Sequence, residues 1–374
     1  MPWPVTRPCL PEMFRNVLLQ ALKTPASLSM LSMEGWDVLV RQARAAGLLS
    51  RLSHQLQGMG LANVVPPQIR WHFEAADTLA LKQLTAVRRE LLAIQEALAD
   101  LPGPVVVLKG AAYVAARLPN AEGRLFNDID LLVPRAQLSQ AESALMLAGW
   151  HPAPLSDYDR RYYRRWMHEI PPLQHAIRET VIDLHHAILP ETARYRPDPS
   201  QLFARAVALS DWPGLAVLSP EDRILHSATH LFHDGELAHG LRDLSDLDLL
   251  IRDAAARDAN FWMQLAKRAD TLQLGRSLYY ALRYTRHFLD TPMPDTVLEM
   301  LRPAAPARLT RALMDAVFSR ALLPDHASCD GSCTPVARLA AYVRAHWLRM
   351  PAHLLIPHLL HKALISPHLE SRHT

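Results

Sequence analysis

Two aspartates separated by one apolar residue, Asp128 and Asp130, are the residues of this sequence best placed to do chemistry. Asp128-Ile129-Asp130-Leu131-Leu132-Val133 alternates and then runs apolar, which predicts a strand. Residues i and i+2 of a strand share a face, so the two carboxylates would lie side by side. A divalent cation relieves their repulsion, and oxygen ligands favour Mg²⁺ or Mn²⁺. The alternative is a strand edge that carries two solvated aspartates.

A third carboxylate, Asp183, lies in a second predicted strand, Val181-Ile182-Asp183-Leu184-His185. Three aspartates on neighbouring strands could hold two metal ions, which would stabilise the attacking and leaving oxygens of a phosphoryl transfer. We therefore expect the carboxylates of Asp128, Asp130 and Asp183 to converge. Because like charges repel, Asp130→Asn should slightly stabilise the metal-free protein.

A β-branched run, Val105-Val106-Val107-Leu108, predicts a buried strand upstream of the aspartates. It ends at Lys109-Gly110, where glycine would let backbone N–H groups approach an anion at the start of a short helix. Lys109 or Arg124 could bind further phosphate oxygens. Arg124 is the better candidate because its planar fork can hold two oxygens, whereas Lys109 can instead pair with an aspartate.

These segments together resemble the uncharacterised nucleotidyltransferase family of the DNA polymerase β nucleotidyltransferase superfamily. The resemblance rests on Leu108-Lys109-Gly110-Ala111-Ala112, on the run from Arg124 to Val133, and on Ile182-Asp183-Leu184-His185. It implies that Asp128, Asp130 and Asp183 are catalytic and bind metal, with Asp183 as a candidate base. It further implies nucleotide-binding roles for Lys109, Gly110, Ala111, Arg124 and His185. The wider superfamily usually has Gly-Ser or Gly-Gly where this chain has Gly110-Ala111, so one hydroxyl contact to phosphate is missing.

The resemblance implies an enzyme that uses Mg²⁺ (or Mn²⁺) to move a nucleoside monophosphate from an NTP to an acceptor. The acceptor could be a small molecule, a protein or an RNA. A non-catalytic nucleotide-binding or scaffold protein is one alternative. A toxin-like tRNA nucleotidyltransferase is another, because the segment from Tyr158 to Trp166 interleaves arginines with aromatic residues, as RNA-binding surfaces do. A basic surface near an anionic substrate would explain that segment equally well.

The elements that must position these residues form an α+β chain. Two-residue periodicity is confined to 104–187, with strands at 105–108 and 128–133 and two more within 168–186. Helical periodicity covers 13–23, 34–57, 67–99, 111–118, 134–148, 220–233, 240–254, 258–269, 271–288, 294–302, 306–322 and 336–365. This pattern predicts three regions. They are an N-terminal helical region (1–103), a nucleotidyltransferase-like α/β core with a small mixed sheet (104–198) and a C-terminal helical region (199–374).

Composition excludes some classes of protein. A hydrophobic fraction of 49% in 374 residues excludes a mainly disordered chain, and a net charge of +3 is too mild to indicate a nucleic-acid binder. Three cysteines and no apolar segment at the N-terminus favour the cytoplasm. No stretch of about 18 uninterrupted apolar residues predicts a transmembrane helix.

Three weaker patterns keep more than one interpretation each. His226, His230 and His233 share a helix face and could bind zinc, but packing in an interface or beside a phosphate pocket explains them as well. The loop with His326, Cys329 and Cys333 could bind a metal or simply carry two free thiols. The acidic run Asp243, Asp246 and Asp248 predicts an interdomain contact, the rim of a nucleotide pocket or a solvated face.

Overall fold

The computed structural model describes residues 16–156, 161, 163, 166–235, 237–351 and 353–355. Most of the Tyr158–Trp166 segment, Cys9 and the end of the last predicted helix lie outside the described residues. A membrane-spanning helix is not found among the residues that are described, because no helix there combines the necessary length and apolar character.

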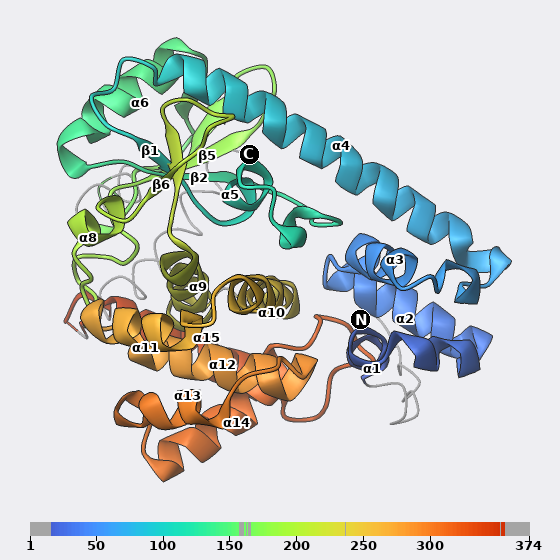
Figure 1. The fold of residues 1–374 in the computed structure, drawn as a ribbon. Coiled ribbons are helices and arrows are strands. Elements are labelled where there is room, and N and C mark those ends of the chain that lie inside the picture. The colour runs from blue at the N-terminus through green and yellow to red at the C-terminus, as the bar shows by residue number, and fades with distance from the viewer. Residues whose placement is uncertain are drawn as a thin grey trace, which may run out of the picture.

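A mixed seven-stranded sheet lies at the centre of the fold, in the order β3-β4-β5-β2-β1-β7-β6 (Figure 1). Its strands are β1 (Val105–Val107), β2 (Ile129–Leu132), β3 (Trp150–Pro152), β4 (Leu173–His175), β5 (Val181–His185), β6 (Val207–Ala208) and β7 (Leu215–Val217). β2 runs parallel to β5 and β1 parallel to β7, whereas the other neighbours are antiparallel. The predicted α+β class with a mixed sheet between helical regions is confirmed.

The sheet extends beyond the predicted strand-rich segment. β6 and β7 fall after residue 199, where only helix was expected, and β7 pairs in register with β1. These strands have two and three residues, so they are too short to show a two-residue alternation in sequence. The three-residue β3 was missed for the same reason.

The N-terminal helices lie to one side of the sheet, and one long helix connects them to it. The elements are α1 (Val17–Lys23), α2 (Met33–Ala45), α3 (Leu49–Gly58) and α4 (Pro67–Ala97). α4 packs against α3 at one end and against α5 and α6 at the other (Figure 1). The single helix predicted over 34–57 is wrong, because the chain turns at Gly47, which has φ 67°.

Two helices accompany the first strands of the sheet, and a third precedes β6. They are α5 (Lys109–Ala115), α6 (Leu138–Leu147) and α8 (Pro199–Phe203). α5 begins at Lys109, two residues earlier than predicted, so the Lys109-Gly110 turn is the first turn of this helix.

The C-terminal helices pack beneath the sheet in the view of Figure 1, with α9 and α10 next to it. They are α9 (Pro220–Thr229), α10 (Gly240–Arg257), α11 (Phe261–Thr271), α12 (Gly275–Leu289), α13 (Asp295–Met300), α14 (Arg308–Ala321) and α15 (Thr334–Arg349). Ser219 caps α9 by accepting a hydrogen bond from the backbone of Asp222, with Pro220 at the first position, as predicted. The helix predicted over 220–233 instead changes to a π-helical turn at His230–Asp234.

A buried ion-pair triad joins the three parts of the chain. Asp246 of α10 forms an ion pair with Arg51 of α3 at 2.8 Å and another with Arg124, in the loop before β2, also at 2.8 Å. All three side chains are at least nine-tenths buried. Burial opposes ionisation of Asp246, but the two guanidinium groups outweigh it and lower the pKa of this carboxyl. Asp246 therefore makes a buried contact between segments far apart in the sequence, and the solvated acidic face is wrong for this residue.

Removal of this shared charge should destabilise the whole fold. Asp246→Asn would leave Arg51 and Arg124 buried without a counter-charge, so we expect the free energy of unfolding to fall by about 3 kcal/mol in urea denaturation. Asp253→Asn on the same helix is the control, since the ion-pair partner of Asp253 is the exposed Arg257. The control should lose less than about 1 kcal/mol. Equal losses in both variants would contradict the role assigned to the triad.

Candidate active site

Asp130 and Asp183 lie directly opposite each other on two adjacent parallel strands. The register of β2 and β5 pairs Asp130 with Asp183, and neighbouring strands are separated by about 4.8 Å. Asp128 precedes β2 by one residue, lines the same cavity as Asp183 and interacts electrostatically with Asp130. The structure therefore brings together the three carboxylates that the sequence singled out.

Lys109 compensates the charge of Asp130. Its Nζ lies 2.8 Å from Asp130 Oδ1, and Asp130 is only 2% exposed. Burial opposes the charged ammonium, but Asp130 outweighs it and raises the pKa of Lys109. Lys109 has φ 43°, a left-handed conformation that is strained for a residue with a side chain. The predicted pairing of Lys109 with an aspartate is confirmed.

His185 makes a second contact to the same oxygen. Its Nε2 lies 3.0 Å from Asp130 Oδ1, and its Nδ1 lies 3.2 Å from Oε2 of Glu169. Burial would lower the pKa of His185, but these two carboxylates outweigh it and raise the pKa. In return, Lys109 and His185 overcome the burial of Asp130 and hold its pKa well below the usual value. The expectation that Asp130→Asn stabilises the metal-free protein is therefore unsupported, because Asp130 is paired twice.

The other two aspartates carry the excess negative charge. Burial, Asp130 and Glu169 raise the pKa of Asp183 to about 7. Burial and Asp130 likewise raise the pKa of Asp128. Among the described residues, no hydrogen bond or ion pair is recorded for either carboxyl. Carboxylates held close together without enough positive charge fit a divalent cation.

The described residues show one tighter group of ligands, and it is not the aspartate trio. Only His168, Glu169 and His185 bring three ligand atoms within 4.8 Å of one another in the part of the chain that is described. At least one pair among the three aspartates is therefore wider than this limit. The positive charge in contact with Asp130 is the ammonium group of Lys109.

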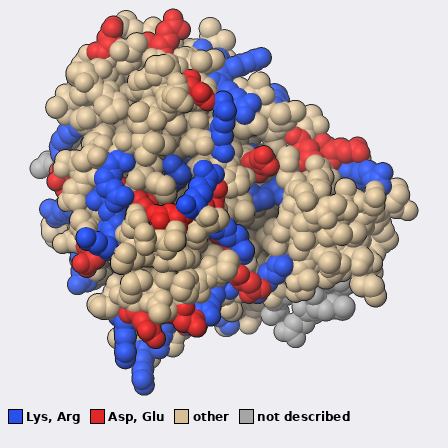
Figure 2. Space-filling view, viewed as in Figure 1, with Lys and Arg blue, Asp and Glu red and all other residues tan. Residues whose placement is uncertain are grey.

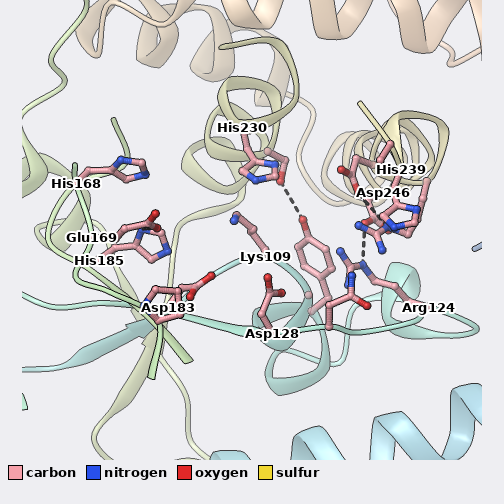
Figure 3. A pocket seen from close by; sticks show the side chains of 18 of the residues that line it. Lys109, Arg124, Asp128, His168, Glu169, Asp183, His185, His230, His239 and Asp246 are labelled. Atoms are coloured by element: carbon pink, nitrogen blue, oxygen red, sulfur yellow. Dashed lines mark hydrogen bonds and ion pairs between the residues drawn. The ribbon is translucent and has the colours of Figure 1, made fainter. Parts of the chain in front are cut away.

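A cavity of about 270 Å³ lies in front of these residues. Figure 3 shows His168, Glu169 and His185 on one side, Asp183, Asp128 and Lys109 in the middle, and Arg124, His239 and Asp246 on the other side. Near the middle of the face shown in Figure 2, acidic side chains are gathered with basic ones around them. The volume is close to the lower limit of small-molecule sites, which is roughly 300 Å³.

A family model matches the segment of the chain that carries this site. The model, described as uncharacterised nucleotidyltransferase, matches residues 32–290. The chain belongs to this nucleotidyltransferase family. The matched segment includes all three aspartates, the Lys109-Gly110 turn and the buried Asp246. No curated protein and no solved structure gives a match.

Gly110, the glycine of the predicted phosphate turn, allows a close approach of Arg124. A Cβ atom on Gly110 would lie 2.4 Å from Nη1 of Arg124 and 3.0 Å from Cδ1 of Phe126. The Arg124 guanidinium therefore crosses directly over Gly110, held by Asp246 and by the carbonyl of Leu125. The pairing with Asp246 outweighs burial and raises the pKa of Arg124. Arg124 lines the cavity, but its predicted contact with phosphate stays a prediction, as do the binding roles of Gly110 and Ala111.

Sequence reasoning missed several residues that line the cavity. They are Tyr113, His168, Glu169, His239 and Arg349. His168-Glu169 is visible in the sequence, but nothing in its spacing relates it to His185, and the cross-strand contact depends on the tertiary fold. Arg242 and Asp243 belong to the acidic run, and the rim of the pocket was one of the roles predicted for this run. Nε of Arg242 lies 3.0 Å from Oδ1 of Asp243.

The histidine face predicted on one helix divides at the π-helical turn. His230 lines the cavity, whereas His226 and His233 are buried. Burial, together with Lys109, lowers the pKa of His226 to about 3. The three do not form a ligand cluster within the described residues, so packing beside the pocket explains them. In the other weak pattern, Cys329 is buried and Cys333 exposed, and neither forms a disulfide.

Charge compensation predicts opposite effects for two neighbouring aspartates. Native Asp183 binds its proton more tightly than the unfolded chain does, so its contribution to stability is lost as pH rises from about 4 to about 7. Asp183→Asn should therefore raise the free energy of unfolding at pH 8 and change it little near pH 4.5. Asp130→Asn should lower it at pH 8 by roughly 1.5–3 kcal/mol, because the ionised form is the one that Lys109 and His185 bind.

Urea denaturation of both variants at the two pH values measures these effects without any ligand. Destabilisation by Asp183→Asn at pH 8 would show that Asp183 is compensated in the native protein, contrary to the assignment.

A methyl group at Gly110 should displace the Arg124 guanidinium. We expect Gly110→Ala to lower the free energy of unfolding by about 1–3 kcal/mol, the usual cost of forced repacking. Gly58→Ala, at the end of α3, is the control, because no atom lies within 4 Å of its added Cβ. The control should be neutral or slightly stabilising. A neutral Gly110→Ala would mean that Arg124 moves aside without cost.

Proposed function

We propose that this protein is a metal-dependent nucleotidyltransferase that moves a nucleoside monophosphate from an NTP to an acceptor hydroxyl. The observation that carries the proposal is the register of Asp130 and Asp183 on adjacent parallel strands, with Asp128 and Asp183 lining one cavity. Membership of the nucleotidyltransferase family supports the same class of reaction. The cavity beside these aspartates gives the substrates a place to bind.

The proposed metal ligands are Asp128, Asp130 and Asp183, and the carboxylate donor set favours Mg²⁺ or Mn²⁺. Metal ions bound there would neutralise charge on the phosphate oxygens. The raised pKa values of Asp128 and Asp183 support this assignment, because both groups lack sufficient positive charge in the metal-free protein. Lys109 would have to share Asp130 with an ion or leave it.

The proposed reaction is a direct displacement at the α-phosphorus. The acceptor oxygen forms a bond to this phosphorus, the bond to the bridging oxygen breaks, and pyrophosphate leaves. The proton of the acceptor hydroxyl would pass to a carboxylate oxygen of Asp183, as the general base. Lys109 and Arg124 line the same cavity, and we propose that they orient the phosphates beside Gly110 and Ala111.

NTP binding should depend on divalent metal and on Asp128. We expect Asp128→Asn to weaken NTP binding in the presence of Mg²⁺ at least about tenfold, or 1.4 kcal/mol, in calorimetric titrations with each NTP. The fold should remain intact, because no hydrogen bond or ion pair of Asp128 is found among the described residues. Asp253→Asn, far from the cavity on the outer part of α10, is the matched control and should bind as the wild type does.

Incubation of the wild type with each NTP, labelled at the α-phosphate, plus Mg²⁺ and cell extract would then identify the acceptor class by the labelled product. NTP binding of equal strength without Mg²⁺, or an unaffected Asp128→Asn variant, would overturn the mechanism.

A further inference from the structure

A second group of ligands lies on one side of the cavity, beside the aspartates. The ligand atoms of His168, Glu169 and His185 all lie within 4.8 Å of one another (Figure 3). His168 is 8% exposed, and the side chains of Glu169 and His185 are 17% and 5% exposed. Two imidazoles and one carboxylate make this group chemically different from the all-oxygen aspartate trio.

The backbone fixes this group without any bound ion. The segment that carries His168 and Glu169 runs antiparallel to the end of β5, where Glu169 and His185 form an isolated bridge. Ile170 donates a backbone hydrogen bond to Leu184 at 3.0 Å, and His186 donates one to His168 at 2.9 Å. The ligands are therefore preorganised by main-chain contacts on both sides of the bridge.

His185 lies between two carboxylates but, as a neutral imidazole, has only one N–H group. If Nε2–H donates to Asp130 at 3.0 Å, the lone pair of Nδ1 faces Glu169 Oε2 at 3.2 Å, and both are acceptors. Either a second proton on Nδ1 or a metal ion between these two atoms satisfies the contact. Two ligands of a tetrahedral zinc ion, with bonds of about 2.0–2.1 Å, are separated by roughly 3.3 Å, which matches the observed distance.

Asp130 and His168 complete the pattern of a metal site. A histidine that ligates a metal commonly donates its other N–H to a carboxylate, as His185 can to Asp130. The His168 ring lies 5.2 Å from the His185 ring, centroid to centroid. All three ligands line the cavity, so a fourth coordination position would face it. Three protein ligands with one open position are typical of catalytic rather than structural zinc sites.

We propose that His168, Glu169 and His185 bind one divalent transition-metal ion of the zinc type, with an open position toward the cavity. The nitrogen ligands distinguish this site from the proposed Mg²⁺ site, because imidazole favours Zn²⁺ and similar ions over Mg²⁺. An oxygen atom of a substrate in the cavity can fill the open position. The site does not depend on nucleotidyl transfer, since its ligands and geometry are complete without a nucleotide.

The test is metal binding by the purified full-length protein after treatment with a chelator. We expect Co²⁺ to bind with about one ion per chain and to give the strong visible absorption of a four-coordinate site, and Zn²⁺ to displace it. Excess Mg²⁺ should not displace it. His168→Gln should weaken Co²⁺ binding more than about tenfold, since even groups that only support a ligand contribute roughly 10–100-fold. His151→Gln, on the exposed face of β3, is the control and should bind normally.

Glu169→Gln is a second variant of nearly unchanged shape, so the test survives if His168→Gln fails to fold. It should also lose Co²⁺ affinity, whereas Asp128→Asn should retain it. Absence of tetrahedral Co²⁺ binding in the wild type would overturn the proposal and would indicate that a doubly protonated His185 serves both carboxylates. Equal loss in Asp128→Asn would place the ion at the aspartates and overturn it too. Neither result bears on NTP binding, which is measured separately.

Discussion

One nearly inaccessible carboxylate, Asp130, determines how the site is built. Asp130 is 2% exposed, so its negative charge must be compensated within the protein. Lys109 and His185 both contact the same carboxylate oxygen and supply this compensation. To reach it, Lys109 adopts a left-handed backbone conformation at the start of α5. His185 reaches it only because β5 pairs with β2 in this register. With two partners on Asp130, the neighbouring Asp128 and Asp183 keep the unbalanced charge that a cation would neutralise.

A second buried aspartate, Asp246, is also compensated by cationic side chains, and these come from distant parts of the chain. Its partners Arg51 and Arg124 come from the N-terminal helices and from the loop that enters β2, whereas Asp246 itself belongs to α10. Arg124 also crosses Gly110, which follows Lys109 directly. Asp130 and Asp246 are thus connected through the close approach of Arg124 to Gly110. The packing of the helical regions and the geometry of the site therefore depend on each other.

The sequence predicted those parts of the site whose signals are local. Asp128 and Asp130 are two residues apart, and Asp183 lies in an alternating strand, so periodicity alone places all three on the sheet. The partner of Arg124 could not be predicted, because Asp246 is 122 residues away and only the packing of α10 brings it close. The same holds for His168 and Glu169, which meet His185 across a bridge. β6 and β7 are too short to carry a pattern, and the break at Gly47 depends on one backbone angle.

The two proposed metal sites would be coupled through one oxygen atom. The transition-metal site requires His185 to keep its Nε2–H on Asp130 Oδ1, since this contact directs Nδ1 toward Glu169. The aspartate site needs the same carboxylate for a divalent cation, in competition with Lys109 and His185. An ion that displaced Lys109 alone would leave His185 oriented and allow both sites to fill. An ion that displaced His185 would free this ring to turn from Glu169. Whether the cavity can hold both kinds of metal at once therefore depends on which contact of Asp130 an ion displaces first, that of Lys109 or that of His185.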